Sequence, residues 1–395
     1  MKELRDAGRG DASLAGAEML LGTIDSRARY GMTTGSPADA RRDELVERLF
    51  GSALGAMDLL CVYLGDRLGL YRALADAGPS TSAELAGVAG VNERYAREWL
   101  EQQAMAGILE AVDPNASDAE RRYVVPAGHD EVLLDGGSLN HMAPMAQLVV
   151  ACALPIRAVL EAFGTGDGIP YAAYGADLHE GQARFTQPLF DHLLTTDWLP
   201  AVATIHDRLD GDPPARVADL ACGLGRSSIA IARGYPKVTV DGIDLDQASI
   251  VRAQQLLPTS GVEDRVAFHG RDAADPELSG RYDLVTIFEA LHDMSYPVDV
   301  LRAARGLLSD GGRVLVADER TAERFALDAG DVERLYYGFS VLHCLPVGMV
   351  GENAAGTGTV MREDTVRGYA EQAGFADCDV APIENDFWRF YLLTP

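Results

Sequence analysis

Apolar residues in the first third of the chain follow the three- and four-residue spacing that is typical of helices. Five of them predict one apolar helix face: Leu54, Met57, Leu60, Leu64 and Leu68. Thr81 and Glu84 have the spacing of a capping box, which predicts that a short helix begins there and runs to Val88. Asn92 is a good N-cap for a second helix that runs to Met105.

Two short runs rich in strand-forming residues follow, over residues 108–112 and 122–125, with the turn-forming residues 114–117 between them. A helix, a helix-turn-helix and a hairpin is the order of a winged-helix domain, which we assign to residues 41–130. This segment contains nine basic and fifteen acidic residues. Because neutralisation of phosphates supplies most of the non-specific affinity for DNA, the acidic excess favours a dimerisation or scaffolding domain.

Two less regular segments flank this domain. Residues 1–40 are polar, glycine-rich and weakly patterned, and we interpret them as a flexible tail with one short helix near residues 15–22. Residues 131–210 have helical spacing and are predicted as a helical connector that also covers a pocket. Their longest apolar stretch, residues 142–156, is too short to span a bilayer and contains two prolines, which favours a buried helix pair.

From residue 215 onward, short β-rich runs alternate with helical stretches, which is the βαβ pattern of a parallel sheet. Seven strands are predicted, at residues 216–220, 238–243, 266–269, 284–288, 313–317, 378–381 and 387–393. Residues 321–361 are too long for a simple crossover and are predicted to lie over the pocket as an insert. The predicted fold class is α/β, with a Rossmann-like seven-stranded sheet over residues 211–395 after an α-rich winged-helix domain.

Composition and charge limit the function further. The chain has 395 residues, of which 24% are charged and 47% hydrophobic, enough for about two or three domains with their own cores. The formal net charge of −26 repels phosphate backbones and anionic lipid surfaces, so we expect no nucleic-acid or membrane partner. Five scattered cysteines without a C-x-x-C pair indicate a reducing cytoplasm, and the charged N-terminus does not resemble a secretion signal.

A glycine-rich turn follows the first strand of the sheet. Gly223 and Gly225 let a ligand approach the backbone at the start of a helix, with a purely structural tight turn as the alternative. A dinucleotide fingerprint starting at Gly223 would need a glycine where Ser228 stands, so NAD and FAD fit poorly. Asp219 would repel a pyrophosphate but attract an ammonium group. Asp244 ends the next strand, where an acid can accept hydrogen bonds from both ribose hydroxyls.

Asp272, just after the third strand, can accept a hydrogen bond from an adenine amino group. Ammonium, ribose and adenine without a pyrophosphate together describe S-adenosylmethionine. The residues that carry this pattern resemble the motifs of class I S-adenosylmethionine-dependent methyltransferases: Asp219, Ala221, Gly223, Gly225, Asp244, Arg271, Asp272 and the run Phe288-Glu289-Ala290-Leu291-His292-Asp293. The resemblance covers about residues 41–395, because small-molecule O-methyltransferases of this class share the N-terminal winged helix.

Three runs resemble an actinobacterial branch of the family: Leu291-His292-Asp293-Met294, Val316-Ala317-Asp318-Glu319 and Leu342-His343-Cys344-Leu345-Pro346. The resemblance implies S-adenosylmethionine as cofactor, S-adenosylhomocysteine as product, and a seven-stranded sheet whose last strand is antiparallel. It also implies a homodimer formed through the N-terminal domain. Ala221 departs from the family, in which glycine is usual at this position, and alanine tolerates fewer backbone angles.

The resemblance also assigns the candidate site. It places the cofactor against Asp219, Ala221, Gly223, Gly225, Asp244, Leu245, Arg271, Asp272, Ala273, Phe288 and Glu289. His292 is the candidate general base, because a similar His-Asp run supplies the base in plant-type O-methyltransferases and imidazole accepts protons near neutral pH. A histidine that only packs beside the cofactor is the alternative. The expected lining of the acceptor pocket is Tyr171, Tyr174, Trp198, Tyr337 and His343, and no metal site is expected.

The sequence therefore predicts a methyltransferase that uses S-adenosylmethionine to methylate a small molecule, with O-methylation in secondary metabolism as the expected reaction. Two other functions remain open. An enzyme that cyclises or cleaves the cofactor without methyl transfer would need the same cofactor contacts. A winged-helix regulator that senses a metabolite would need a basic surface stripe, which the composition does not indicate.

Overall fold

The computed structural model describes residues 36–275 and 277–395. The short helix expected near residues 15–22, and most of the tail predicted for residues 1–40, lie outside the described residues. Helix α2 (Pro37–Arg67) already begins at Pro37, so the last residues assigned to the tail belong to a helix. The chain divides into two compact units after Cys61, which leaves the end of α2 in the second unit.

The winged-helix domain contains three short helices and a two-stranded antiparallel hairpin: α3 (Leu70–Ala77), α4 (Ser82–Ala89), α5 (Glu93–Met105), β1 (Glu110–Ala111) and β2 (Tyr123–Val124). The predicted capping box is confirmed. Thr81 Oγ1 accepts a hydrogen bond from the Glu84 N–H at 3.3 Å, and Glu84 Oε2 accepts one from the Thr81 N–H at 2.8 Å. The Asn92 side chain caps α5 by accepting from the Arg94 N–H at 3.0 Å.

The two sides of α2 differ in their surroundings. At Gly65, a Cβ atom would lie 2.5 Å from a ring carbon of Trp99 and 2.6 Å from one of Tyr71, so only glycine fits there. The predicted apolar face is exposed instead, with Leu60 at 40% and Met57 at 59% of their full accessible surface. The periodicity therefore identified a helix correctly, but this face has no covering element among the described residues.

Helices alone connect the winged-helix domain to the sheet: α6 (His129–Leu134), α7 (Ala143–Ala153), α8 (Ile156–Thr165), the 3-10 turn η1 (Tyr171–Tyr174), α9 (Gly175–Leu189), the π-helical η2 (Phe190–Trp198), α10 (Leu199–Ala201) and α11 (Ala203–Asp210). The expected buried pair is correct only for α7, because Leu160 and Phe163 of α8 are exposed. Within the described ranges, no helix alone has the length and apolarity to cross a membrane. Only α7 and α8 taken together meet that test, and they are bent by 50°.

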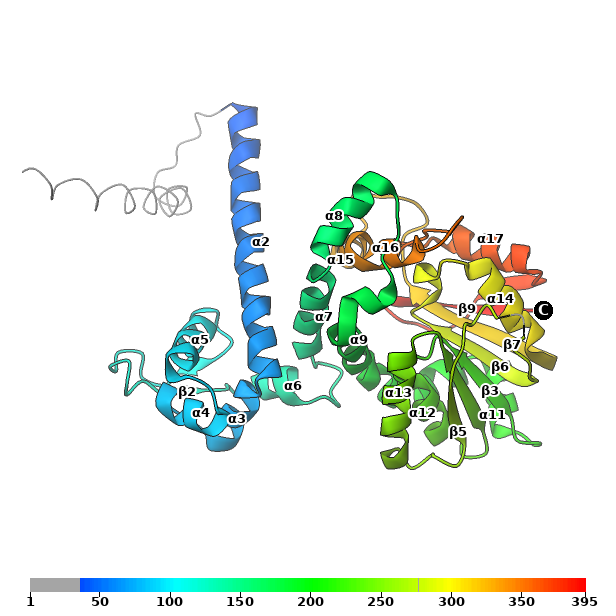
Figure 1. The fold of residues 1–395 in the computed structure, drawn as a ribbon, viewed down its shortest axis with the longest axis horizontal. Coiled ribbons are helices and arrows are strands. Elements are labelled where there is room, and N and C mark those ends of the chain that lie inside the picture. Colours follow the sequence, from blue (N-terminus) through cyan, green and yellow to red (C-terminus); the bar gives the residue numbers. More distant parts are fainter. Residues whose placement is uncertain (1–35, 276) are drawn as a thin grey trace, which may run out of the picture. The chain divides into compact units, whose positions relative to one another are not determined.

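The C-terminal part forms one seven-stranded sheet (Figure 1) with the order β5-β4-β3-β6-β7-β9-β8. Its strands are β3 (Arg216–Leu220), β4 (Thr239–Asp244), β5 (Val266–Gly270), β6 (Tyr282–Phe288), β7 (Leu308–Glu319), β8 (Asp377–Val380) and β9 (Trp388–Thr394). The first five run parallel, and β9 pairs antiparallel with β7 and β8. The predicted α/β fold, with an antiparallel last strand, is confirmed.

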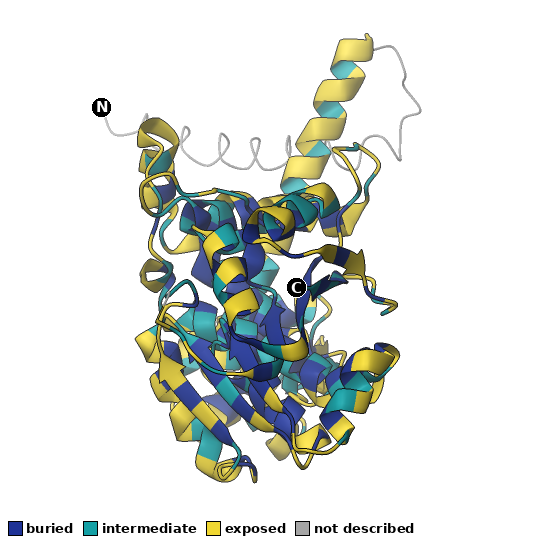
Figure 2. Cartoon of the chain, turned by 90° about the vertical axis from the view of Figure 1, so that its right-hand side faces the viewer, coloured by how far each residue is buried: buried dark blue, intermediate teal, exposed yellow. Residues whose placement is uncertain are grey.

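Helices cover both faces of this sheet. Between and after the strands lie α12 (Arg226–Gly234), α13 (Gln247–Leu256), η3 (Leu257–Thr259), η4 (Leu291–Asp293), α14 (Pro297–Gly306), α15 (Asp331–Phe339), the π-helical η5 (Ser340–Cys344), α16 (Leu345–Gly348) and α17 (Glu363–Ala373). One apolar core joins η2, α11, α12 and α13 to the sheet, and a second core joins α14 and α17 to it. Figure 2 shows the buried residues gathered along the strands. The parallel strands are thus buried on both sides and expose their carboxyl ends as the place for a site.

The capping box at α4 is expected to contribute measurably to stability. Replacing Thr81→Ala removes the acceptor for the Glu84 N–H and should lower the free energy of unfolding by about 1 kcal/mol. Urea unfolding followed by tryptophan fluorescence checks this. The matched control is Thr204→Ala, since Thr204 is exposed in the first turn of α11, where no side chain caps the helix. A loss in the control as large as in Thr81→Ala would contradict the role of the cap.

Candidate active site

A cavity of about 650 Å³ lies where the parallel strands end. The turns after β3, β4 and β6 form one side of it, and α9 together with the segment around α16 forms the other. In open α/β sheets ligands bind at this edge, beside the strand where the sheet order reverses. The cavity therefore has the position and the size of a site for a small ligand.

The turn after β3 takes backbone conformations that suit a close approach by a ligand. Ala221 and Gly223 have φ values of 55° and 52°, in the left-handed region, and an added Cβ at Gly223 would meet open space. The Gly223 N–H donates to Asp244 Oδ2 at 2.8 Å, and the Asp246 N–H donates to Asp244 Oδ1 at 2.8 Å. Burial raises the pKa of Asp244 to about 6. Ala221, the departure from the family pattern, is thus tolerated at an angle where glycine is favoured.

The carboxylate of Asp219 does not reach out to a ligand as expected. It accepts hydrogen bonds from the hydroxyls of Ser227 at 2.6 Å, Ser228 at 2.6 Å and Thr286 at 2.8 Å. Burial nevertheless raises the pKa of this carboxyl. Asp219 borders the cavity, but its oxygens are used to fix the turn, so the predicted role as the ammonium partner needs correction.

Two further predicted cofactor residues do not line the cavity. An added Cβ at Gly225 would lie 2.2 Å from the ring of Phe268, so this glycine is required by packing beneath the turn. Arg271 forms an ion pair with Asp275 at the surface. The other predicted cofactor residues do line the cavity: Asp219, Ala221, Gly223, Asp244, Leu245, Asp272, Ala273, Phe288 and Glu289.

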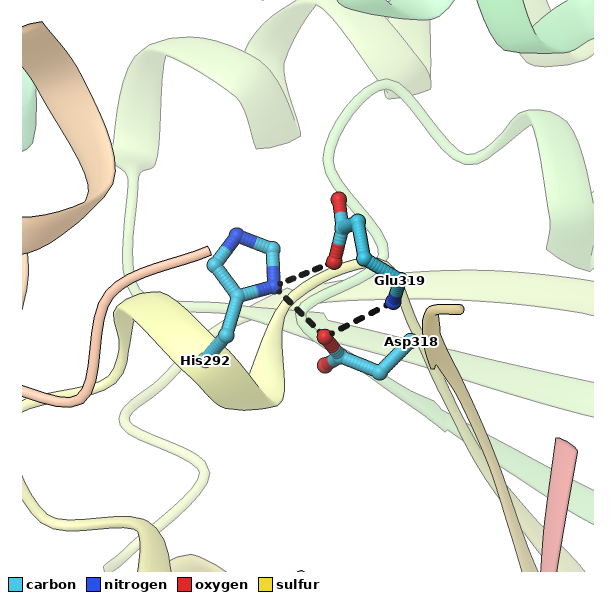
Figure 3. Close-up of side chains that lie close together, drawn as sticks. All are labelled: His292, Asp318 and Glu319. Atoms are coloured by element: carbon cyan, nitrogen blue, oxygen red, sulfur yellow. Dashed lines mark hydrogen bonds and ion pairs between the residues drawn. The ribbon is translucent and has the colours of Figure 1, made fainter. Parts of the chain in front are cut away.

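His292 is placed behind the cavity wall, not in it. Figure 3 shows its Nδ1 facing both Asp318 and Glu319, while the other ring nitrogen points away from these carboxylates. Nδ1 lies 2.9 Å from Asp318 Oδ1 and 2.9 Å from Glu319 Oε2, and all three residues are buried. Burial alone would lower the pKa of His292, but the charges of Glu319 and Asp318 outweigh it and raise the pKa well above its usual value. The two buried carboxylates beside Nδ1 therefore favour the protonated imidazole.

Among residues 36–275 and 277–395, these three side chains form the candidate site for a metal ion, because their ligand atoms lie within 4.8 Å of one another. A proton on Nδ1 shared between two carboxylates accounts for both 2.9 Å distances, which are typical of charge-assisted hydrogen bonds. We interpret the cluster as an ion-pair network. The absence of a metal site stays a prediction.

Only one of the residues predicted for the acceptor pocket reaches the cavity. Tyr171 lines it, and its ring stacks on His179 with centroids 4.7 Å apart. The other four residues do not line the cavity. Tyr174 donates to the Leu342 carbonyl at 2.8 Å, and Trp198 packs on Trp388 and Phe390 in the core. The Tyr337 hydroxyl accepts a hydrogen bond from Arg362, and His343 packs edge-on against Tyr174. These four were predicted from residue type alone, which does not distinguish core from pocket.

Part of the lining was not predicted from the sequence. The additional residues come mostly from α9, from the segment after η4 and from the end of the insert, and include His179, Gln182, Thr186, Met294, Ser295, Tyr296, Val347 and Val350. None of them belongs to a recognisable motif. Asp246 had a local signal, since it follows Asp244 by two residues and caps α13 by accepting from the Ser249 N–H at 2.7 Å.

The lining fits S-adenosylmethionine better than a dinucleotide. Six acidic residues border the cavity, namely Asp219, Asp244, Asp246, Asp272, Glu289 and Asp293, against a single arginine, Arg226, among the described lining residues. Such a lining disfavours a pyrophosphate and favours a cation. Asp244 and Asp272 lie at the ends of neighbouring strands β4 and β5, as ribose and adenine recognition require.

Two family models match the chain. A model described as a methyltransferase domain matches residues 212–359, and a model described as an Rv2258c-like winged HTH domain matches residues 55–135. The predicted methyltransferase resemblance and the predicted winged helix are both confirmed by these matches. The methyltransferase match includes the glycine turn and the strands that border the cavity.

Curated relatives match over shorter stretches. A 27-O-demethylrifamycin SV methyltransferase of Amycolatopsis mediterranei is 33% identical over 123 residues, which is 30% of this chain and 45% of that protein. A ubiquinone biosynthesis O-methyltransferase of Ralstonia nicotianae is 28% identical over 206 residues, which is 51% of this chain and 77% of that protein. The chain therefore spans less than half the length of the first of these relatives.

Solved structures resemble the whole described fold. The mitomycin 7-O-methyltransferase MmcR superposes with a TM-score of 0.64 at 19% identity and covers 91% of this chain and 99% of its own. Human N-acetylserotonin methyltransferase, in complex with S-adenosylmethionine, gives a TM-score of 0.61 at 18% identity and covers 92% and 98%. At such identities these structures confirm the fold. The family models show that a stretch matching a methyltransferase domain, residues 212–359, follows a stretch matching an Rv2258c-like winged helix-turn-helix domain, residues 55–135.

Proposed function

We propose that this protein is an S-adenosylmethionine-dependent methyltransferase that methylates a hydroxyl group of a small molecule of secondary metabolism. The observation that carries the proposal is the acidic cavity at the carboxyl edge of the sheet, where the turn after β3 meets the ends of β4 and β5. Proteins named as a 27-O-demethylrifamycin SV methyltransferase and a mitomycin 7-O-methyltransferase support the choice of acceptor.

The cofactor would lie along the strand ends. Each Asp244 oxygen is held by one backbone N–H and keeps a lone pair that can accept from a ribose hydroxyl. Asp272 would accept from the adenine amino group, and Gly223 leaves room for the ligand against the backbone. When bound, S-adenosylmethionine supplies a methyl group on a positively charged sulfur. The acidic lining attracts that charge.

The acceptor would lie against the other wall. The stacked pair of Tyr171 and His179 offers a flat aromatic surface there, and Met294, Val347 and Val350 make the wall apolar. Burial raises the pKa of Tyr171 well above its usual value, so this phenol stays neutral. In a direct displacement most of the acceleration comes from holding the reacting atoms in line, and these side chains would fix the acceptor for that purpose.

Binding of S-adenosylhomocysteine tests the cofactor assignment. Calorimetry should detect binding to the wild type and a loss of affinity in Asp244→Ala. Since only the ionised carboxylate can accept from both ribose hydroxyls, and the pKa of Asp244 is about 6, the wild-type affinity should fall as the pH drops below that value. The control is Asp264→Ala, an exposed carboxylate outside the cavity. A wild type that does not bind would contradict the proposed function, and unchanged binding by Asp244→Ala would contradict the ribose contact.

The reaction itself is tested by its products. The wild type, incubated with S-adenosylmethionine and a panel of phenols that includes catechol and 4-nitrophenol, should form S-adenosylhomocysteine only when a phenol is present. Chromatography of the nucleoside products checks this. Methylthioadenosine formed without any acceptor would instead indicate cyclisation or cleavage of the cofactor.

We also propose that two copies of the chain associate through α2. The apolar face of this helix is exposed over several turns at Leu45, Val46, Leu49, Leu54, Met57, Leu60 and Leu64, and exposed Leu68 follows just after the helix ends. An exposed apolar surface of this length is unusual for a monomer and typical of an interface. A second copy offers the same self-complementary face, as two-fold symmetric dimers require.

Charges on this face should separate the copies. The double variant Leu49→Glu with Met57→Glu places like charges in the proposed interface, and light scattering should show its mass falling from two chains to one. The variant Arg48→Glu changes the charge on the other side of α2, where Arg48 is exposed, and should leave the mass unchanged. A wild type with the mass of one chain would contradict the dimer.

A further inference from the structure

The backbone of Glu289 has a conformation that residues with a side chain rarely adopt. Its φ is 53°, and its N–H donates to the Ala317 carbonyl at 2.7 Å, which ties the turn after β6 to β7. Glu289 directly follows β6, and its side chain lines the cavity. Unfavourable backbone angles of this kind persist where the surrounding structure enforces them, and they are common at functional sites.

Groups on several elements surround this carboxyl. His292 and Asp293 act on it from η4, Asp318 from β7 and Tyr336 from α15, and the side-chain amide of Gln182 on α9 favours its ionised form. Burial raises the pKa of Glu289 to about 7; the positive charge of His292 opposes this, and Asp318 and Asp293 add to it. A carboxylate with these neighbours can both lose and accept a proton near neutral pH.

His292 is poorly placed for the same task. Its Nδ1 faces two buried carboxylates, and Cys344 forms a hydrogen bond with its side chain. It is not among the lining residues of the cavity, whereas Glu289 and its partner Gln182 both are. A base has to lie within hydrogen-bonding reach of the proton that it takes, and Glu289 meets this condition for a ligand in the cavity.

We propose that Glu289 is the general base of the reaction and takes the proton from the acceptor hydroxyl, while His292 stays protonated behind it as a positioning residue. The inference rests on the proposed function, because it requires methyl transfer to a hydroxyl. The acceptor oxygen forms the new bond to the methyl carbon as the carbon–sulfur bond breaks, and the sulfur keeps that electron pair. The proton of the hydroxyl moves to a carboxylate oxygen of Glu289 and later leaves to water.

The test compares the wild type with Glu289→Gln, an isosteric change that keeps the size of the side chain and its ability to form hydrogen bonds. Turnover of catechol, whose hydroxyls stay protonated near neutral pH, should fall by about 10²–10⁴-fold, because general base catalysis contributes that much. Calorimetry should show that the affinity for S-adenosylhomocysteine is unchanged, which distinguishes a base from the cofactor contact that the resemblance implied for Glu289. In the wild type, kcat should rise with pH until it levels off above about 7, and the infrared band of a protonated carboxyl, absent in the variant, should disappear over the same range. Glu371→Gln, on the exposed side of α17, is the matched control.

A variant of His292 tests its positioning role. His292→Gln removes the positive charge that lowers the pKa of Glu289, so the infrared titration should move to higher pH. Should this variant not fold, because Asp318 and Glu319 lose their partner, the measurements on Glu289→Gln decide the proposal without it.

Each other result overturns a distinct claim. Unchanged turnover in Glu289→Gln, or no carboxyl titration between pH 6 and 8, would reject the proposed base, because an ordinary glutamate titrates at about pH 4. Weaker binding of S-adenosylhomocysteine by this variant would make Glu289 a cofactor contact. A wild type that binds S-adenosylhomocysteine but methylates none of the phenols would also reject the proposed base, since the proposed step needs an ionisable hydroxyl. A wild type that does not bind S-adenosylhomocysteine would reject the proposed function itself.

Discussion

The buried carboxylate of Asp219 holds the parts of the cavity together. Three hydroxyls donate to it, two from Ser227 and Ser228 at the start of α12 and one from Thr286 on β6. Since Asp219 is the second-to-last residue of β3, one side chain joins two neighbouring strands to the helix that follows the glycine turn. A buried carboxylate without such partners would be strongly unfavourable, so this arrangement fixes the turn. Asp244 holds the same turn from its other side.

The sheet could be predicted closely because its parallel strands are buried on both faces and form short apolar runs. Strand β3 has the predicted bounds, whereas β7 starts earlier than predicted because Gly311 and Gly312 suggest a turn while the strand pairing continues past them. Helices were harder to interpret. The spacing of Leu54, Met57 and Leu60 shows that α2 has an apolar face, but periodicity carries no information about what covers such a face.

The site could be predicted where its residues share one segment of the chain. The turn after β3 and the acids after β4 and β5 follow from sequence order, since the carboxyl ends of parallel strands meet at one edge. Residues from distant segments could not be found in this way. Gln182 carries no motif, Trp198 is an aromatic residue of the core, and the pairing of His292 with Asp318 spans 26 positions. The backbone angle of Glu289 is likewise imposed by tertiary structure and not by residue type.

The acidic lining has a consequence for turnover under the proposed function. Methyl transfer leaves a neutral thioether in place of a sulfonium, so the ligand loses one positive charge inside a cavity bordered by Asp244, Asp246 and Asp272. Attraction between opposite charges is stronger in a partly buried site than in water. The same side chains would therefore hold the fresh cofactor more tightly than the spent one. Product release and resistance to product inhibition would follow from electrostatics alone, without any conformational change.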